Sequence, residues 1–179
     1  RSAPASRVRL EFEGRYAAML SHEPKNYALL GDDGALTLRG VAFRSSRAEP
    51  FGEAFLRAAI ARLLVGDVPG VRAAYLASVD AVRGLRAPPF DVSSLVRLSR
   101  SPDDYQAGRG ERRELAYEAL LAAGRTTWRV GERIRCYRTR GGGGALVDLD
   151  RAALDPRRDY DVEHYLRVLR DTFAARLAR

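Results

Sequence analysis

The residue types that carry catalysis are sparse in this sequence. His22 and His164 lie far apart, and neither stands at a metal-ligand spacing or within a known serine or cysteine nucleophile motif. Asp32 and Asp33 form an adjacent pair of carboxylates, but between two glycines they are more typical of a hairpin turn than of a metal site. The sequence therefore predicts no complete catalytic set.

Two further features weigh against a cofactor site. Glycines 141–144 are not followed by the Lys-Ser/Thr of a phosphate-binding loop and do not open a helix after a strand, so they predict a flexible connector. Cys136 is the single cysteine, which excludes an internal disulfide, and with two histidines it cannot complete a usual structural zinc site. We expect no metal or cofactor to be held by this chain.

The basic residues are more informative. The net charge of +8 and the pI of about 10.2 are typical of proteins that bind polyanions. Basic residues cluster with turn and aromatic residues at Arg39, Arg44, Arg47, Arg97, Arg100, Tyr105, Arg109, Arg112 and Arg113. A second row contains Arg133, Arg135, Arg138 and Arg140, of which the first two would share one face of a strand. Such rows can follow phosphates without reading base sequence.

An alternative explanation for the arginines is codon usage in a GC-rich genome, which would place them on solvated faces without a binding role. That bias does not explain Lys25, because it acts against lysine. Of the 31 basic residues, Lys25 is the one lysine and the others are all arginines.

Hydrophobic periodicity places these residues on a series of short elements. The alternation over 8–12 predicts a half-buried strand that 16–20 could continue, and apolar runs on both sides of 31–34 predict a β-hairpin. Helical spacing, N-terminal prolines and terminal glycines predict helices over 50–66, 69–83 and 112–123, and a closing helix after the N-cap Asp161. Residues 86–90 predict a rigid link, 93–105 a short strand and a turn, and 132–140 a strand that pairs with 145–150.

The layout is rich in strands first and helical afterwards, so we expect an α+β fold with a boundary near residue 48. A chain of 179 residues suits one domain, or one domain with an attached piece of another. No apolar run is long enough to cross a bilayer and no leader opens the sequence, so we expect no membrane partner and a cytoplasmic location.

Several landmarks resemble family B DNA polymerases. Lys25-x-Tyr27-Ala28, then a turn with Asp33-Gly34 and Leu36-x-x-Arg39-Gly40, is similar to the family's Lys-x-Tyr segment. Two helices follow, then Leu98-x-Arg100-x-x-x-Asp104-Tyr105, a short helix, and "VGERIRCYRT", which is similar to the family's Gly-Asp-x-Val-x-Tyr strand. Asp159-Tyr160-Asp161-x-x-His164-Tyr165 resembles the start of the thumb helix, so the resemblance spans about residues 8–175.

The resemblance implies a palm edge with the Lys-x-Tyr hairpin over 1–48 and a mainly helical thumb with a small β-hairpin over 49–179. In the family, this lysine and tyrosine bind the primer-template duplex near the primer terminus, which implies the same role for Lys25 and Tyr27. A slender ammonium can enter a minor groove where a planar guanidinium prefers a fixed geometry. The alternative is a chance lysine beside a core tyrosine.

The implied function is that of a palm and thumb portion of a bacterial DNA-directed DNA polymerase, located at the nucleoid and acting in replication or repair. It would bind and position primer-template duplex for a nucleotidyltransferase reaction. The family's Asp-x-x-Ser-Leu-Tyr, Lys-x-x-x-Asn-Ser-x-Tyr-Gly and Asp-x-Asp motifs do not occur in this chain. We therefore expect the catalytic carboxylates, and the two Mg²⁺ ions that they hold, in the remaining polymerase domains or chain.

Two stretches depart from the family's pattern. The family's Arg-Arg-Asp-Trp-like stretch is replaced by "FRSSRAEP", where Arg44 and Arg47 are the possible substitutes. Its Pro-His-Val is replaced by "GRGERREL", where Arg109, Arg112 and Arg113 could supply duplex contacts differently. An alternative function of another class is a standalone, non-catalytic nucleic-acid-binding or scaffolding protein derived from a polymerase thumb.

Overall fold

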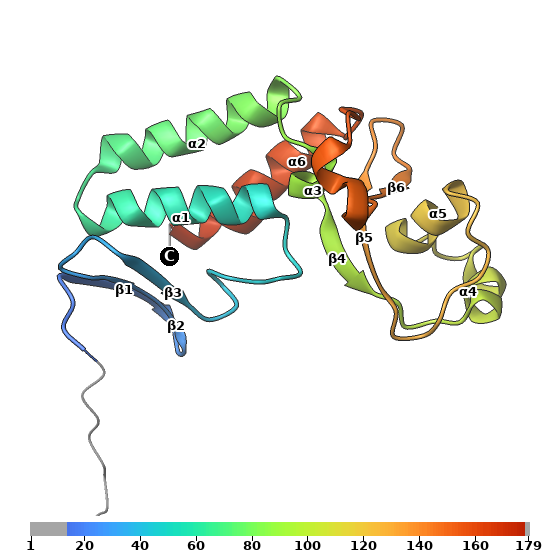
Figure 1. The fold of residues 1–179 in the computed structure, drawn as a ribbon, viewed down its shortest axis with the longest axis horizontal. Coiled ribbons are helices and arrows are strands. Elements are labelled where there is room, and N and C mark those ends of the chain that lie inside the picture. Colours follow the sequence, from blue (N-terminus) through green and yellow to red (C-terminus); the bar gives the residue numbers. More distant parts are fainter. Residues whose placement is uncertain (1–13, 178–179) are drawn as a thin grey trace, which may run out of the picture.

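The computed structural model describes residues 14–177, so the strand expected at 8–12 lies outside the described residues. The fold is α+β, as expected, with two small antiparallel sheets joined by helices (Figure 1). The strands are β1 (Ala18–Glu23), β2 (Asn26–Leu30), β3 (Leu36–Arg39), β4 (Ser94–Arg97), β5 (Arg133–Arg138) and β6 (Gly144–Leu146). The helices are α1 (Pro50–Leu64), α2 (Val68–Arg83), α3 (Pro89–Val92), α4 (Pro102–Gly108), α5 (Leu115–Ala122) and α6 (Val162–Val168).

The first sheet has the order β1-β2-β3 and contains the predicted hairpin as its second and third strands. Leu30 pairs with Leu36 across the turn, and Asp33 Oδ1 accepts a hydrogen bond from Ala35 N at 2.9 Å. This confirms the turn role of Asp33, since Asx side chains commonly bond the backbone two residues on. The remaining strand of this sheet, β1, begins and ends later than the continuation over 16–20 that the sequence pattern indicated.

The inner face of this sheet packs against α1, and α2 packs in turn against α1 (Figure 1). Ala28 and Leu38, which are neighbours on β2 and β3, share a buried cluster with Leu56 and Ile60 of α1. The cluster includes Val79 of α2, one of the residues that helical spacing placed inward. Both helices are confirmed.

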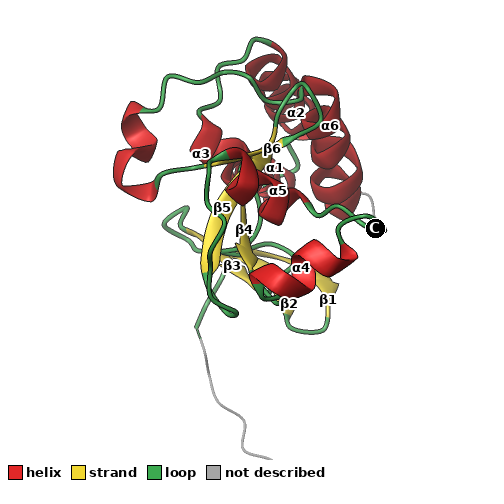
Figure 2. Cartoon of the chain, turned by 90° about the vertical axis from the view of Figure 1, so that its right-hand side faces the viewer, coloured by secondary structure: helices red, strands yellow, loops and turns green. Residues whose placement is uncertain are grey.

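The second sheet has the order β4-β5-β6 and packs with α4 and α5 (Figure 2). Its β5–β6 hairpin confirms the predicted partner strand. Glycines 141–143 form the turn, but Gly144 lies in β6, which corrects the interpretation of all four glycines as a connector. A Cβ at Gly144 would lie 2.5 Å from the carbonyl oxygen of Leu115, so glycine lets β6 approach α5 closely.

Buried tyrosines connect the second sheet with the end of α2 and with the segment that leads into α6. Tyr160 Oη donates a hydrogen bond to the carbonyl oxygen of Val82 at 3.1 Å, and Tyr165 Oη accepts one from Arg138 N at 2.8 Å. Tyr137 Oη donates to Asp159 Oδ1 at 2.7 Å. Each hydroxyl therefore satisfies its polar requirement while its ring fills the core.

The chain ends in a helical segment that closes over α1. Asp161 caps α6 as predicted, its Oδ1 accepting a hydrogen bond from His164 N at 3.0 Å. The helix then widens into the π-helical turn η2 (Leu169–Phe173) and tightens into η3 (Ala174–Leu177). Phe173 is buried directly against Gly52, where an added Cβ would lie 2.1 Å from the ring.

Two connecting segments are more ordered than their sequences indicated. The expected rigid link contains the short helix α3, and the expected turn before Tyr105 is the helix α4. Ser101 caps α4, because its Oγ accepts a hydrogen bond from Asp104 N at 3.2 Å, and Pro102 occupies the first turn. This Ser-Pro start is a recognisable helix signal that the sequence analysis missed.

The boundary near residue 48 stays a prediction. Residues on both sides of it belong to one buried cluster, which holds Ala28, Leu38 and Phe43 together with Phe55 and Phe173. The first sheet is therefore packed against the helices that follow it, as one continuous core.

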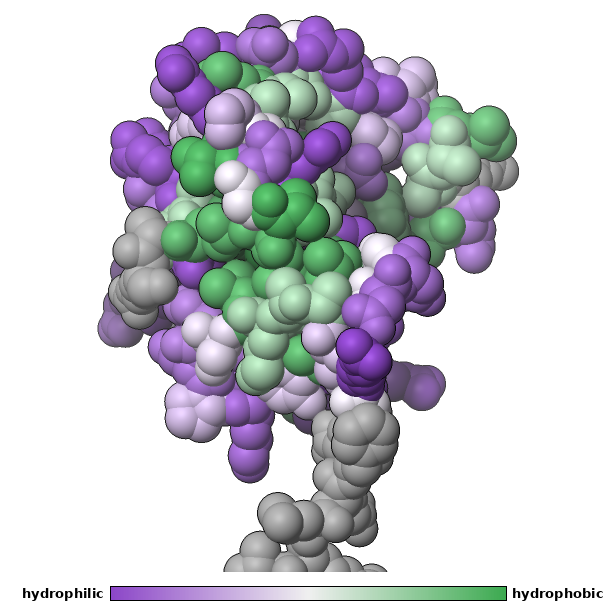
Figure 3. Space-filling view, turned by 90° about the vertical axis from the view of Figure 1, so that its left-hand side faces the viewer, coloured by the Kyte–Doolittle hydropathy of each residue, from purple (hydrophilic) through white to green (hydrophobic). Residues whose placement is uncertain are grey.

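Apolar side chains gather on the surface at the end of the molecule seen in Figure 3. Val65 and Val68, at the turn between α1 and α2, are each more than 60% exposed, as is Met19 on β1. Among the described residues, no helix combines the length and the apolar character needed to cross a bilayer.

The contact between Gly52 and Phe173 gives a stability prediction. We expect Gly52→Ala to lower the free energy of unfolding by about 1–3 kcal/mol, the usual cost of overpacking, because the methyl group would overlap the ring. The higher helix propensity of alanine, worth about 1 kcal/mol, acts in the opposite direction. Urea unfolding measures the difference, with Gly110→Ala as the control because a Cβ there meets no atom within 4 Å. Equal stability of the two variants would contradict the prediction.

Candidate nucleic-acid interface

The outer face of the first sheet brings two predicted residues together. Tyr27 on β2 is directly opposite Arg39 on β3, and both point away from the core that holds Ala28 and Leu38. A surface hollow of about 500 Å³ is lined by Tyr16, Tyr27, Leu29, Thr37 and Arg39. Tyr27 is half-buried and Arg39 is exposed, so an aromatic ring and a cation border the same hollow.

Lys25 occupies the tight turn between β1 and β2 in an unusual backbone conformation. Its φ of 68° lies in the left-handed region, which favours glycine and costs other residues about 1–2 kcal/mol. The side chain is exposed and forms no hydrogen bond or ion pair with the described residues. An outlier of this kind persists only where the surrounding structure holds it.

Two neighbouring residues hold this turn. Asn26 is buried, and its Oδ1 accepts a hydrogen bond from Ala42 N at 2.9 Å while its Nδ2 donates to the carbonyl oxygen of Pro24 at 3.3 Å. Gly40 has φ 84°, and a Cβ there would lie 2.3 Å from the carbonyl oxygen of Lys25. The segment after β3 therefore presses against the turn. The sequence analysis missed Asn26, although it lies within Lys-x-Tyr.

Arg44 and Arg47 follow the first sheet, and both are exposed. Arg44 borders a hollow with Pro50 and Glu53 at the start of α1. The carbonyl oxygen of Arg47 accepts a hydrogen bond from Leu95 N at 3.0 Å, so this residue lies against the edge of β4. Arg47 thus connects the neighbourhood of the first sheet with that of the second.

Tyr105 is placed in the core, with no exposed surface. Its ring stacks on Tyr117 with centroids 4.3 Å apart, and its Oη donates to Glu118 Oε1 at 2.7 Å and accepts from Glu114 N at 3.1 Å. These contacts give Tyr105 a structural role, and we leave it out of the surface proposed below.

Two of the predicted arginines are neutralised within the fold. Arg109 forms a bidentate pair with Glu118, at 2.8 and 2.9 Å, and Arg100 lies 3.3 Å from Glu114. The hydrogen bonds from Arg109 and then from Tyr105 lower the pKa of Glu118 to about 2. A guanidinium that already shares its charge with a carboxylate is a weaker phosphate ligand than a free one.

The remaining predicted arginines are free. Arg97, Arg112 and Arg113 are exposed, and no ion pair or side-chain hydrogen bond joins them to any described residue. The predicted residues thus form two groups. Lys25, Tyr27 and Arg39 lie on the first sheet, and the group from Arg97 to Arg113 lies at the opposite end of the long axis (Figure 1).

The second arginine row is divided in the same way. Arg135 Nη1 donates to the carbonyl oxygen of Ser93 at 2.9 Å, and Arg138 pairs with Asp161 at 3.2 Å. Arg133 and Arg140 are exposed and carry no ion pair within the described chain. Arg133, Arg135 and Arg138 lie on β5 as predicted, whereas Arg140 lies in the turn after it, and position on the strand did not separate structural from free arginines.

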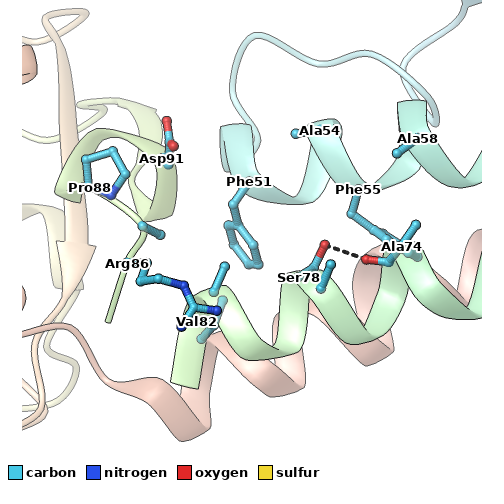
Figure 4. Close-up of a pocket in the computed structure, with 13 residues that line it drawn as sticks. Phe51, Ala54, Phe55, Ala58, Ala74, Ser78, Val82, Arg86, Pro88 and Asp91 are labelled. Atoms are coloured by element: carbon cyan, nitrogen blue, oxygen red, sulfur yellow. Dashed lines mark hydrogen bonds between the residues drawn. The ribbon is translucent and has the colours of Figure 1, made fainter. Parts of the chain in front are cut away.

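An apolar hollow of about 420 Å³ lies between α1 and α2 (Figure 4). Alanines of both helices line much of it, Ser78 Oγ donates to the carbonyl oxygen of Ala74 at 3.0 Å, and Arg86 and Asp91 stand at one end. It holds none of the predicted site residues. Within residues 14–177, no three His, Cys, Asp or Glu side chains come together as metal ligands would.

Comparison with solved structures finds this arrangement of elements within a family B DNA polymerase. One similar structure is the family B DNA polymerase of the hyperthermophilic archaeon Pyrobaculum calidifontis, with a TM-score of 0.70 over 94% of this chain. The identity is 18%, and the match spans 22% of that polymerase. No family model and no curated protein matches the sequence.

The expected resemblance to family B polymerases is therefore confirmed at the level of the fold. The chain has the fold of a segment that makes up about a fifth of that polymerase. The bacterial origin inferred from composition stays a prediction, and the similar structure is archaeal.

The Lys25 turn gives a prediction that separates the effect of backbone conformation on stability from that of the side-chain charge. We expect Lys25→Gly to raise the free energy of unfolding by about 0.5–1 kcal/mol, because relief of the left-handed conformation exceeds the extra backbone entropy of glycine. Lys25→Ala keeps the backbone cost and should not stabilise the fold. Urea unfolding of both variants measures this, and equal stability of the two would contradict it.

The Glu118 cluster gives a pH prediction. The pKa of Glu118 is about 2 in the fold, below its ordinary value of 4.5, so its contribution to stability is present above about pH 4.5 and is lost as the pH falls towards 2. We expect Glu118→Gln to be less stable than the wild type at pH 7, with a gap that shrinks between pH 4.5 and 2. Thermal unfolding across this range measures it, with the exposed Glu111→Gln as control. A gap independent of pH would count against it.

Proposed function

We propose that this chain forms the palm-edge and thumb portion of a family B DNA-directed DNA polymerase, and that it binds and positions primer-template duplex for DNA synthesis. The observation that supports this most directly is the fold shared with a family B polymerase over 94% of the chain. The Lys-x-Tyr residues lie on an exposed turn and sheet face, which supports a role in contact with a ligand.

The proposed interface consists of Tyr27 and of cations that form no ion pair within the described chain. Lys25, Tyr27 and Arg39 would seat the duplex near the primer terminus, and Arg44 and Arg47 would extend this contact. At the other end, Arg97, Arg112 and Arg113 would hold the sugar-phosphate backbone. Contacts of this kind position a duplex and add salt-dependent affinity without reading its sequence.

Catalysis would require the remaining polymerase domains or chain as partner. Two-metal phosphoryl transfer needs carboxylates that hold both ions beside the primer terminus. We propose that those carboxylates and the two Mg²⁺ ions belong to the partner, and that this chain alone retains the duplex without extending it.

Duplex binding tests the proposal directly. We expect the chain to bind a primer-template duplex more tightly than a single strand or a blunt duplex, with affinity that falls as salt rises. Lys25→Ala and Lys25→Gly should both weaken binding, because each removes the ammonium, whatever its effect on stability. Fluorescence anisotropy across a salt series measures this, with Arg72→Ala as control because Arg72 is an exposed cation on α2 outside the interface.

Two outcomes would contradict the proposal. No binding at low salt would exclude a duplex-gripping role for this chain. Equal binding of all three nucleic acids, unaffected by Lys25, would favour the standalone, non-catalytic nucleic-acid-binding protein.

A further inference from the structure

Two free arginines oppose each other on the second sheet. Arg97 ends β4 and Arg133 begins β5, and the antiparallel register places them directly opposite. Both side chains are on the sheet face away from the cluster that contains Ile134 and Cys136. Residues directly opposite on one face of an antiparallel pair have Cβ atoms about 4.5–5.5 Å apart, so the two guanidinium groups can reach the same point.

No described carboxylate compensates this pair. Arg97 and Arg133 form no ion pair with any residue in 14–177, although several neighbouring arginines do. Glu132, the acid next in sequence to Arg133, pairs with Arg125 at 2.8 Å and accepts a hydrogen bond from Arg129 N. Like charges directly opposite destabilise a sheet, so an unoccupied pair of this kind is a cost to the fold.

Gly131 and the backbone of Arg47 lie near this pair. Gly131 stands beside the pair, and a Cβ there would lie 3.4 Å from Arg97 Nη2. Arg47 borders the same sheet edge, because its carbonyl oxygen bonds to Leu95 N, two residues before Arg97. Arg135 lies further along the same face. Its guanidinium donates to the carbonyl oxygen of Ser93 and stacks on Phe90, with Cζ 4.5 Å from the ring centroid.

We infer that Arg97 and Arg133 clamp one phosphate group between them. A guanidinium presents a planar fork of donors that matches a phosphate, and two opposed forks can bind different oxygens of one group. The phosphate removes the repulsion between the arginines. The identity of this phosphate rests on the proposed function: it is a backbone phosphate of the bound duplex. Arg133 therefore joins the interface beside Arg97.

The salt dependence of duplex binding distinguishes one shared phosphate from two separate ones. Each neutralised phosphate contributes about 0.9 to the slope of log K against log salt. We expect the variant with both Arg97→Ala and Arg133→Ala to lose about 0.9 of slope, and each single variant to lose less, since one guanidinium still covers the phosphate. A loss of about 1.8, or one no larger than that of Arg72→Ala, would overturn the clamp.

A second measurement does not depend on DNA. At low ionic strength, inorganic phosphate should raise the thermal unfolding temperature of the wild type more than chloride does at equal ionic strength, and the double variant should lose this difference. If phosphate raises the unfolding temperature of the wild type no more than chloride does, the clamp is wrong.

The two measurements separate the clamp from the proposed function. If the wild type responds to inorganic phosphate but the double variant keeps the wild-type salt slope for duplex binding, the clamp does not bind the DNA backbone. If the wild type binds no duplex, the proposed function fails, and the response to phosphate alone decides the clamp. If Lys25→Ala weakens duplex binding while the double variant changes neither duplex binding nor the response to phosphate, the proposed function stands and the clamp is wrong.

Discussion

The contact between Phe173 and Gly52 joins the start of α1 to the C-terminal helical segment, and it lies in the core on which the first sheet packs. The ring lies where a β-carbon of residue 52 would stand, so α1 starts directly beneath the C-terminal helical segment. Phe173 shares its cluster with Ala28 and Leu38, the inner face of the sheet. A π-helical turn, which changes the angular step of a helix, leaves both Leu169 and Phe173 buried against this core. The inner face of the sheet therefore packs in part on residues more than 130 positions away in sequence, and this leaves the outer face exposed.

Positive charge in this chain serves two purposes that the structure separates. Some arginines are paired with carboxylates or stacked on rings, as Arg109 is with Glu118 and Arg135 is on Phe90. Exposed ion pairs are worth little to stability, but they do consume the charge locally. The free cations lie on the first sheet and along the second. Arg97 and Arg133 are both free and stand directly opposite each other, which is the arrangement on which the phosphate clamp is proposed.

Much of the fold could be predicted from the sequence because its signals are local. Pro50, the Gly-flanked turn at 31–34 and the N-cap Asp161 each specify an element end through backbone chemistry, and each is found where expected. The bounds of β1 and the pairing of β4 with β5 were not predicted, since strand register and pairing are tertiary properties. Tyr105 was grouped with the arginines around it, but the helix α4 turns its ring inward. Which arginines are neutralised also depends on residues that only the fold brings together.

At Lys25, the backbone conformation and the choice of side chain are separate questions. The turn geometry disfavours every residue with a β-carbon, and it is imposed by Asn26 and by the close approach of Gly40. That cost falls equally on lysine and arginine, so the backbone gives no reason to prefer one over the other. In a chain that otherwise uses arginine throughout, either the lysine is a chance survivor or its side chain is the reason for it. An ammonium differs from a guanidinium in being compact and free to rotate its three donors, and this is the property that the proposed duplex contact would use.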